Sequence, residues 1–385
     1  MDKIKVLMVA GNMHIGGIEN QLMHLVRNAD REKFQFDFTS NMSNAFYREE
    51  IEQLGGKFII VPEMNWKNPV PYCRAIYQIM KQGKYDIVHS HELFHSGITL
   101  FIAYVAGVPC RFAHAHNWQD DDGTGNKRSI LRSVYNKIMR LLINQFSTAE
   151  IACSTWAGKF VYGKKNIKKQ KFHLVFNSVD TGKFLDHYNQ VESGEYCEIN
   201  GWKNVINVAR ISKVKNQSFL VDIAEEFRRR RDKVRILCVG SGDEEEVKLV
   251  QRKIREKNLD DYIQLLGIRK DVDVLMRKSS AFVLPSKYEG MPLVMIEAQA
   301  SGLPCVSADT YSPEVDFGIG TVTWLSLNKG VKSWADALEE AVNKKRASRS
   351  VVENAIRVKK FDSKMFAQTM CKLYEENYRS RGSRK

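Results

Sequence analysis

The sequence has no apolar run long enough to cross a bilayer. The longest candidate, Ile98–Val108, falls well short of the roughly 20 apolar residues that a spanning helix needs, and Gly107 interrupts it. A secretion signal is lacking as well, because Lys3–Ala10 has the length of a strand and no small-residue cleavage site follows it. We therefore expect a protein that is made and kept in the cytoplasm.

Paired cysteines and the common glycine signatures are also missing. The seven cysteines are scattered without a C-x-x-C pair, so reduced thiols are expected in place of a disulfide or zinc framework. Gly17 and Ile18 stand where a Walker loop needs Lys and Ser or Thr, and Gly240-Ser-Gly242 has no third glycine. These absences argue against a P-loop NTPase and against a dinucleotide oxidoreductase.

One zinc signature occurs, but in the wrong context. His91-Glu92-Leu-Phe-His95 is a literal match to the H-E-x-x-H motif of zinc proteases. That motif needs both histidines on one face of a regular helix, whereas here it directly follows a predicted strand. We therefore expect its first residues to form a loop, and a zinc hydrolase is only a minor alternative.

The chain is long enough for two ordinary domains, and its positive charge is concentrated in one segment. Its 385 residues are 43% hydrophobic and carry a formal net charge of +14. Between Gly123 and Phe176 the only acid is Glu150, against the cations of a basic segment, Lys127–Lys171. These cations are Lys127, Arg128, Arg132, Lys137, Arg140, Lys159, Lys164, Lys165, Lys168, Lys169 and Lys171.

The first part of the basic segment, residues 127–143, mixes bases with apolar residues at helical spacing. This pattern is typical of an amphipathic helix that can lie on an anionic membrane face. A solvated helix packed on the core is the alternative. A nucleic-acid-binding surface is a further one, although no nucleic-acid-binding module accompanies the charge and we expect no nucleic-acid partner.

The rest of the chain alternates apolar, β-rich runs with segments of helical periodicity. Such repeated βα units predict an α/β protein of two Rossmann-like halves with parallel sheets and a cleft between them. The halves are expected at residues 1–190 and 200–362, with the linker in 181–201. Strands are expected at 4–10, 34–40, 57–61, 86–90, 110–115, 151–154, 172–180, 205–210, 235–239, 263–266, 280–284 and 305–308. Helices are expected at 21–27, 45–54, 72–82, 97–106, 127–143, 217–229, 244–257, 272–278, 333–345, 351–359 and 363–378.

In the first half, polar residues stand at strand ends. His89 and His91 end one predicted strand, and His114 and His116 end another. Ligands of open α/β sheets bind at this carboxyl edge, so a functional role and a structural role are both open. The loop from Gly11 to Gly17 follows the first strand, where glycines let the backbone approach a phosphate; a simple tight turn is the alternative.

Two acids stand at a strand-to-helix junction in the second half. After the predicted strand 280–284, a helix is expected to begin at Glu289-Gly290, with Pro292 in its first turn and Glu297 about two turns inside. Both carboxylates can then face one crevice, where the helix N-terminus favours an anionic ligand. A sugar nucleotide offers hydroxyls for the acids and phosphate for the backbone amides.

Two cations follow another strand of the same half. The spacing of Arg210 and Lys215 suits two side chains that reach one diphosphate. Together with Gly240-Ser-Gly, Gly267-Ile-Arg269 and the L-P-S-x-x-E-G-M-P-x-V-x-I-E-A-x-A-x-G-x-P run at 284–304, they resemble the family 4 retaining glycosyltransferases of GT-B fold. The motifs at 16–19, 35–38, 89–91 and 114–117 are similar to those of the branch that builds bacterial exopolysaccharide and capsule.

The resemblance implies roles on the donor side. Arg210 and Lys215 would grip the diphosphate and neutralise charge as the nucleoside diphosphate leaves. Glu297 would take the ribose hydroxyls, and Glu289 would hold the transferred sugar. The backbone of Gly290, Met291, Pro292 and Leu293 would line the same subsite.

Further roles are implied at the margins of the site. Gly16 and Gly17 would complete the phosphate site from the other half, and Gly240 and Arg269 would lie near the nucleotide. His116 would sit beside the sugar near the acceptor. The terminal helix, 363–385, would cross back onto the first half. No bound metal or other cofactor is implied.

Two departures from the family pattern are visible. Ala209 replaces the usual glycine before Arg210, a small change. The segment from Asp309 to Glu314 replaces a Gly-Gly turn, and Glu314 is either a hydroxyl ligand or an acid at a helix start.

We therefore expect a cytoplasmic hexosyl- or N-acetylhexosaminyltransferase, peripheral at the inner face of the cell membrane. It would move a sugar, most simply from a UDP-sugar, to a lipid-linked or polysaccharide acceptor. A UDP-sugar epimerase on the same fold is the nearest alternative, and a basic nucleic-acid-binding protein is a more distant one.

Overall fold

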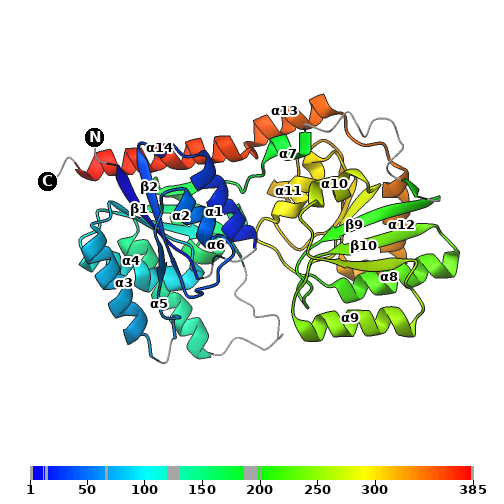
Figure 1. Cartoon of the computed structure of the whole chain (residues 1–385), viewed down its shortest axis with the longest axis horizontal. Coiled ribbons are helices and arrows are strands. Elements are labelled where there is room, and N and C mark those ends of the chain that lie inside the picture. The colour runs from blue at the N-terminus through cyan, green and yellow to red at the C-terminus, as the bar shows by residue number, and fades with distance from the viewer. Residues whose placement is uncertain are drawn as a thin grey trace. The chain divides into compact units, whose positions relative to one another are not determined.

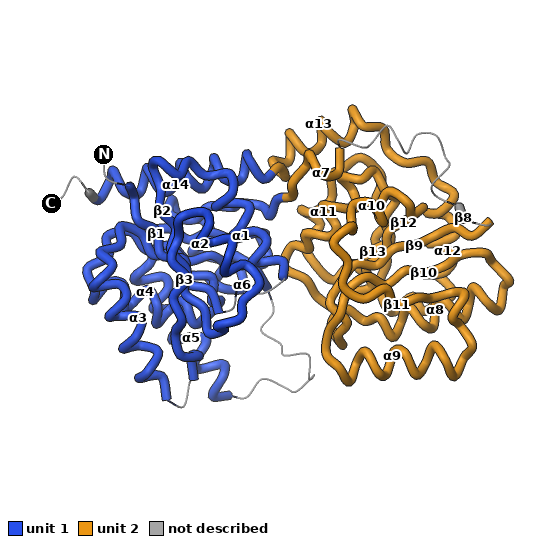
Figure 2. Tube along the Cα trace, viewed as in Figure 1, with its two compact units in different colours: residues 1–178, 363–385 blue, residues 179–362 orange. Residues whose placement is uncertain are grey.

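The computed structural model describes residues 3–11, 13, 16–65, 68–118, 130–185, 198–199 and 201–382. The chain forms two compact units: the first holds residues 1–178 and 363–385, and the second holds residues 179–362 (Figure 2). Lys127 and Arg128 of the basic segment lie outside the described residues. Among the described residues, no helix combines the length and the apolar character that crossing a membrane requires.

The first unit is built on a parallel sheet in the order β3-β2-β1-β4-β5-β6-β7, with helices packed around it (Figure 1). Its central strands are buried on both faces, as in a doubly wound sheet. The strands are β1 (Ile4–Val9), β2 (Phe34–Ser40), β3 (Phe58–Ile60), β4 (Ile87–Ser90), β5 (Cys110–Ala115), β6 (Ala149–Ala152) and β7 (Phe172–Leu174). The helices are α1 (Gly17–Asn28), α2 (Arg48–Gln53), α3 (Val70–Gly83), η1 (Leu93–His95), α4 (Ser96–Val105), α5 (Ile130–Phe146), α6 (Thr155–Tyr162) and η2 (Asn166–Lys168).

The last helix of the chain, α14 (Ser363–Gly382), belongs to the first unit (Figure 2). Phe366, Met370 and Tyr374 are buried in the core of that unit. The Tyr374 ring lies edge-on to Phe112 of β5, with ring centroids 5.1 Å apart. Aromatic burial of this kind contributes about 1.5–3 kcal/mol per side chain, so the helix is held by its apolar face.

The second unit repeats the plan. Its parallel strands run in the order β11-β10-β9-β12-β13-β14, and β8 pairs antiparallel with β9. The strands are β8 (Glu198–Ile199), β9 (Trp202–Val208), β10 (Val234–Val239), β11 (Ile263–Gly267), β12 (Ala281–Leu284), β13 (Cys305–Ala308) and β14 (Val322–Leu325). The helices are α7 (Thr181–Leu185), α8 (Gln217–Arg230), α9 (Glu244–Glu256), α10 (Val272–Arg277), α11 (Leu293–Ala300), η4 (Pro313–Val315), η5 (Leu327–Lys329), α12 (Gly330–Asn343) and α13 (Arg349–Lys359).

Both sheets therefore have the strand order 3-2-1-4-5-6 of a Rossmann fold, and the prediction of two Rossmann-like halves is confirmed. In this order the chain changes direction between the first and fourth strands. The switch points lie between β1 and β4 in the first unit and between β9 and β12 in the second. Ligands of such sheets bind at the carboxyl ends of these strands.

The boundary between the units falls earlier than the expected residue 190. Val179 forms a parallel bridge with Asp362, and the Thr181 hydroxyl donates a hydrogen bond of 2.5 Å to the Asp362 carboxylate. Helix α7 packs against α11 of the second unit. The polar composition of 181–201 predicts a linker, but these contacts assign its first residues to the second unit.

Besides the short 3-10 helices, the sequence-based prediction lacks α6, α7, β8 and β14; α7 and β8 fall in the predicted linker. Strand β14 is only partly buried, so it lacks the continuous apolar run of an inner strand. Helix α6 begins after Ser154, whose hydroxyl accepts a hydrogen bond of 3.2 Å from the backbone N–H of Ala157. Gly158 weakens the helical pattern in the sequence, but a Cβ there would lie 2.9 Å from the Phe172 ring, so close packing favours glycine.

Candidate functional site

The candidate site of the second unit lies at its switch point. Strand β9 leads into the loop 209–216, and β12 leads into the loop 285–292. The two loops are tied together: the Asn216 side chain donates to the carbonyl of Pro285 at 3.2 Å, and the Lys287 N–H donates to the carbonyl of Val214 at 2.8 Å. Asn216 adopts the left-handed conformation, with φ 63°, which Asn tolerates better than most residues. The loops therefore form one fixed edge.

Lys215 and Glu289 form an ion pair across this edge. The side chains are 24% and 10% exposed, respectively, so the pair is shielded but reachable. Arg210, five residues earlier, is exposed. Its guanidinium has neither an ion pair nor a hydrogen bond among the described residues. The structure thus brings a paired cation, a free cation and a carboxylate to one side of the switch point.

Gly240 and Gly242 allow a neighbouring loop to approach this edge closely. Gly240 has φ 134°, and a Cβ there would lie 2.2 Å from the carbonyl oxygen of Ala209. A Cβ on Gly242 would lie 1.9 Å from the carbonyl oxygen of Ile211, with which Gly242 forms a parallel bridge. The backbone of the Arg210 loop is therefore held against the loop after β10, and these glycines are needed for that contact whether or not a ligand binds.

Helix α11 begins slightly later than expected, at Leu293, with Pro292 at its N-cap position. Glu297 is therefore about one turn inside the helix, and not two. Gly290 and Met291 are buried in the preceding loop. Pro292 cannot donate, so the amides of the next residues are the ones that point out of the helix start.

The Glu297 carboxyl has a strongly perturbed environment. Its pKa is raised to about 7, chiefly by burial; the nearby Lys183 ammonium lowers the pKa, and the Asp273 carboxylate raises it. Lys183 and Asp273 lie 3.5 Å apart as an ion pair. The Glu297 carboxylate accepts no hydrogen bond from the described residues. A carboxyl group in this state is suited to accept hydrogen bonds from ligand hydroxyls.

Lys183 was missed by the sequence analysis. It lies on α7, within the segment that the sequence predicts as a linker, and it belongs to no motif. Only the packing of α7 on α11 places its charge near Glu297.

Two further candidates have partners within the protein. Arg269 donates two hydrogen bonds to Asp271, at 2.8 and 2.7 Å, and both side chains are exposed. Glu314 lies in η4, where the Ser312 hydroxyl caps its N–H and donates to its carboxylate at 2.8 Å. The geometry of Glu314 favours the helix-start interpretation over that of a hydroxyl ligand.

In the first unit, His116 follows β5 and is 8% exposed. Its Nε2 lies 2.9 Å from Nδ1 of His91. Burial lowers the pKa of His116 to about 3, so the ring is neutral at physiological pH. Gly16 is the N-cap residue of α1 and Gly17 its first residue, which places both at a helix start as the glycine loop predicts.

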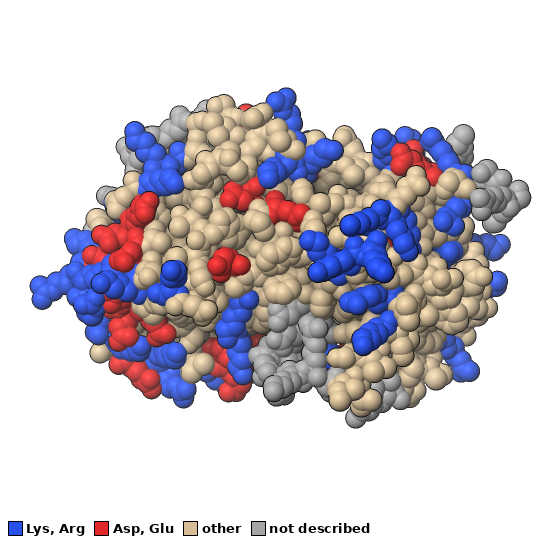
Figure 3. All heavy atoms as spheres, turned by 180° about the vertical axis from the view of Figure 1, so that it is seen from behind, with Lys and Arg blue, Asp and Glu red and all other residues tan. Residues whose placement is uncertain are grey.

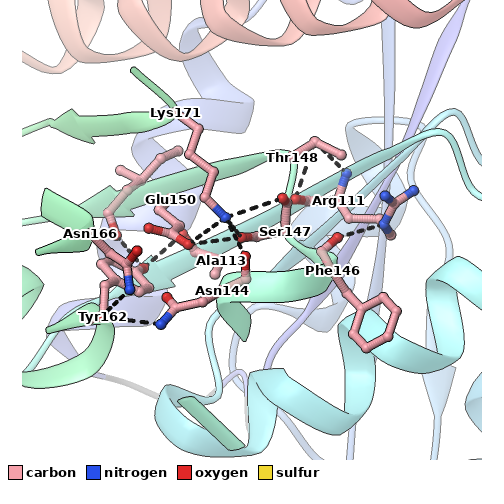
Figure 4. Close-up of polar contacts among 11 residues, drawn as sticks. Arg111, Ala113, Asn144, Phe146, Ser147, Thr148, Glu150, Tyr162, Asn166 and Lys171 are labelled. Atoms are coloured by element: carbon pink, nitrogen blue, oxygen red, sulfur yellow. Dashed lines mark hydrogen bonds and ion pairs between the residues drawn. The ribbon is translucent and has the colours of Figure 1, made fainter. Parts of the chain in front are cut away.

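The basic segment is divided between structural and exposed cations. Lys171 pairs with buried Glu150 at 2.8 Å and donates to the carbonyl of Asn144 and to the hydroxyl of Ser147 (Figure 4). Arg140 donates to the carbonyls of residues 160 and 161. These two cations hold the fold together. The exposed ones are Arg132, Lys137, Lys159, Lys164, Lys165, Lys168 and Lys169.

Helix α5 also exposes a stripe of apolar side chains. Asn136, Met139 and Ile143 face the interior, and the stripe lies on the other side of the helix. The exposed apolar side chains of α5 and those at the end of α4 together make up what we call the apolar face. They are Phe101, Tyr104, Val105, Ile130, Leu131, Val134, Ile138 and Leu141. Lys and Arg gather with few acids among them on one side of the first unit (Figure 3).

Comparison with known proteins agrees with this geometry. Residues 15–183 match the family described as Glycosyltransferase Family 4, and residues 198–358 match the one described as Glycosyl transferases group 1. The protein named "Putative glycosyltransferase EpsF" of Bacillus subtilis is 32% identical over 376 residues, which are 96% of each chain. The chain belongs to the family 4 glycosyltransferases. The resemblance seen in the sequence motifs is confirmed.

This glycosyltransferase has further relatives with more specific names. The capsular polysaccharide biosynthesis glycosyltransferase CapH of Staphylococcus aureus is 24% identical over 374 residues, 96% of this chain and 98% of CapH. The UDP-Gal:alpha-D-GlcNAc-diphosphoundecaprenol alpha-1,3-galactosyltransferase of Escherichia coli is 29% identical over 237 residues, 60% of each chain. The crystal structure of Anabaena HepE with UDP and glucose has a TM-score of 0.75 at 17% identity, covering 97% of this chain and 99% of HepE. That likeness shows the fold, which is GT-B.

Proposed function

We propose that this glycosyltransferase moves a sugar from a UDP-sugar to a lipid-linked glycan, with retention of the anomeric configuration, in exopolysaccharide or capsule biosynthesis. The observation that carries the proposal is the set of Arg210, Lys215, Glu289 and Glu297 around the switch point of the second sheet. The names of the relatives support the finer points. One acts with UDP-Gal on a diphosphoundecaprenol-linked sugar, and another belongs to capsular polysaccharide biosynthesis.

The cations would stabilise the leaving group. When the bond between the sugar and the diphosphate breaks, negative charge develops on the phosphate oxygens. Arg210 can bind these oxygens as a planar fork, and Lys215 can bind them as a point charge. Because Glu289 already holds Lys215, the ammonium is positioned before the donor binds, and preorganised charge of this kind lowers the barrier most. Two protein cations suffice for this task, so the transfer step as proposed uses no metal ion.

The acids would bind hydroxyl groups. Glu297 would accept hydrogen bonds from the ribose of the nucleotide, and Glu289 would bind a hydroxyl of the transferred sugar. The amides at the start of α11 would face the same sugar. The roles of Gly16, Gly17, His116, Gly240 and Arg269 stay predictions from the family resemblance. Of these, Arg269 would have to exchange its pair with Asp271 for the nucleotide.

We further propose that the enzyme works at the inner face of the cell membrane, through the apolar face of α4 and α5 and the exposed cations beside it. A cationic and apolar surface of this composition binds anionic interfaces by charge and by burial of its apolar side chains. Changing Lys164, Lys165, Lys168 and Lys169 to Gln should weaken binding to anionic vesicles. Unchanged binding would assign the segment to ordinary solvated surface.

The donor can be identified directly. The purified protein would be heated with UDP-, GDP- and ADP-sugars in turn, and the donor should raise its melting temperature most. Transfer to a short lipid-diphosphate-linked sugar would then be followed by NMR of the anomeric proton. The proposal expects UDP release coupled to acceptor glycosylation with the donor's anomeric configuration. Inversion would refute the retaining mechanism, and conversion of the UDP-sugar without an acceptor would identify an epimerase.

A further inference from the structure

Four buried histidines lie together on one face of the first sheet. His89 and His91 are two residues apart on one chain segment, and so are His114 and His116, so each pair faces one side. The register pairs His89 with Phe112 and brings the two segments side by side. The rings of His89 and His114 stack with centroids 5.3 Å apart, and those of His91 and His116 stack at 5.2 Å.

These imidazoles are neutral and incompletely hydrogen bonded. All four side chains are at most 8% exposed. Burial lowers the pKa of each of them, well below the usual value for His89, His91 and His114. Nε2 of His89, Nε2 of His91 and both ring nitrogens of His114 have no hydrogen-bond partner among the described residues. Buried polar atoms are rarely left in that state, which points to a ligand.

We propose that His89, His91 and His114 bind a divalent late transition-metal ion, of which Zn²⁺ is the best fit. One ring nitrogen from each lies within 4.8 Å of the others. Around Zn²⁺, with bonds of about 2.0–2.1 Å, tetrahedral ligands lie about 3.4 Å apart, so small rotations of the rings would close the site. Three neutral imidazoles suit Zn²⁺ and not Mg²⁺ or Ca²⁺, which prefer oxygen ligands. Water would supply the fourth ligand.

The surrounding hydrogen bonds orient the ligand atoms. Nδ1 of His89 lies 2.6 Å from the hydroxyl of Tyr374, and Nδ1 of His91 lies 2.9 Å from Nε2 of His116. In both rings Nδ1 is therefore taken up by a hydrogen bond and Nε2 is left for the metal, an arrangement typical of metal-binding histidines. With His91 donating from Nδ1, His116 accepts at Nε2 and carries its proton on Nδ1. The ion would thus fix the tautomer of His116.

The site differs from the one that the H-E-x-x-H motif suggests. Glu92 and His95 do not belong to the histidine group: Nδ1 of His95 lies 2.6 Å from the hydroxyl of Tyr135, and Glu92 accepts hydrogen bonds from Tyr72 and Thr99. His95→Gln is therefore a matched control, because it removes a nearby imidazole but no proposed ligand.

Metal titration tests the proposal. The full chain would be stripped with a chelator and titrated with Zn²⁺ against a chromogenic zinc chelator, and in parallel with Co²⁺, whose visible bands report a four-coordinate site. We expect one ion per chain and a higher melting temperature when it is bound. Tyr374→Phe should weaken Zn²⁺ affinity about 10–100-fold, His114→Gln should weaken it more, and His95→Gln should leave it unchanged.

Opposite results would overturn the proposal. Substoichiometric Zn²⁺ in the wild-type chain would mean that the histidines are a packing cluster only. Loss of binding in His95→Gln with binding kept in His114→Gln would place the ion elsewhere. If circular dichroism shows that His114→Gln is unfolded, Tyr374→Phe decides, since it keeps the ring and removes only the hydroxyl; wild-type affinity in that variant would contradict the arrangement.

Discussion

In both units polar residues follow the strands beside the switch point, but the two sets of residues differ in charge and in burial. In the second unit, the strands beside the switch point end in Arg210, Lys215 and Glu289, which are charged and in part exposed. In the first unit, the strands that follow the switch point end in neutral, buried imidazoles. The shared strand order fixes where a site can lie, and the residue types at the strand ends decide its chemistry. Charges that meet solvent suit a diphosphate, whereas buried lone pairs suit a metal ion.

The largest effect is expected from removing the two cations of the second unit's candidate site. Arg210→Ala and Lys215→Ala should each lower kcat by ~10²–10³, because each would remove a donor that we propose stabilises developing charge. Lys213→Ala is the control, since Lys213 is exposed on the same loop and has no assigned role. Initial rates at saturating donor and acceptor measure the effect. Equal rates in all three variants would remove the diphosphate site from this edge.

The basic segment of the first unit offers a second contrast, between a cation that holds the fold and one that does not. Lys171→Ala leaves the Glu150 carboxylate buried without its partner (Figure 4). Breaking a buried pair in this way costs ~3 kcal/mol of unfolding free energy. Lys164→Ala, on the exposed surface, should change it by less than ~0.5 kcal/mol. Calorimetry on both variants distinguishes them, and equal melting temperatures would contradict the structural role of Lys171.

The sequence predicts the candidate site of the second unit better than the histidine group of the first, for a physical reason. The alternation of apolar strands and helices predicts both sheets, and charged residues directly after strands predict the site around Arg210 and Glu289. Those signals are local in sequence. The histidine group depends on the register of β4 against β5, which brings His89 and His114 together from distant segments. Likewise, nothing in the sequence distinguishes Lys171, which pairs with buried Glu150, from the surface cations around it.

The raised pKa of Glu297 predicts that the stability of the folded protein depends on pH. Its folded-state value of about 7 lies above the ordinary 4.5, so the folded protein holds this proton more tightly than the unfolded chain. The resulting stabilisation is fully present below about pH 4.5 and is lost as the pH rises to about 7. Glu297→Gln cannot ionise, so its melting temperature should exceed that of the wild type increasingly between pH 5 and pH 8.

The same substitution should weaken UDP binding. In the proposed role, the carboxylate form accepts hydrogen bonds from ribose hydroxyls, so wild-type affinity should rise as the pH passes 7, and Glu297→Gln should remove that rise. Calorimetric titration with UDP at pH 6 and pH 8 measures it. A pH-independent affinity in the wild type would show that Glu297 does not bind the ribose, even if the melting temperatures behave as expected.

The smallest expected effect concerns the apolar face. Ile138 and Leu141 are 49% and 68% exposed on α5, and each would bury only part of its surface in a lipid interface. Changing both to Ser should therefore weaken binding to anionic vesicles about 5–10-fold, less than full burial of two such side chains would imply. Val358, which is 68% exposed on α13 of the second unit, supplies the control, and Val358→Ser should bind vesicles as the wild type does.

Salt separates the two contributions to vesicle binding. Attraction between the exposed lysines and anionic lipid weakens as ionic strength rises, whereas burial of Ile138 and Leu141 does not. The Ser variant should therefore lose affinity by the same factor at high and at low salt, whereas the variant with Gln at Lys164, Lys165, Lys168 and Lys169 should lose less at high salt, where screening already weakens its charges. If the Ser variant binds as tightly as the wild type at both salt concentrations, the apolar side chains do not enter the interface, and the first unit meets the membrane through its charges alone.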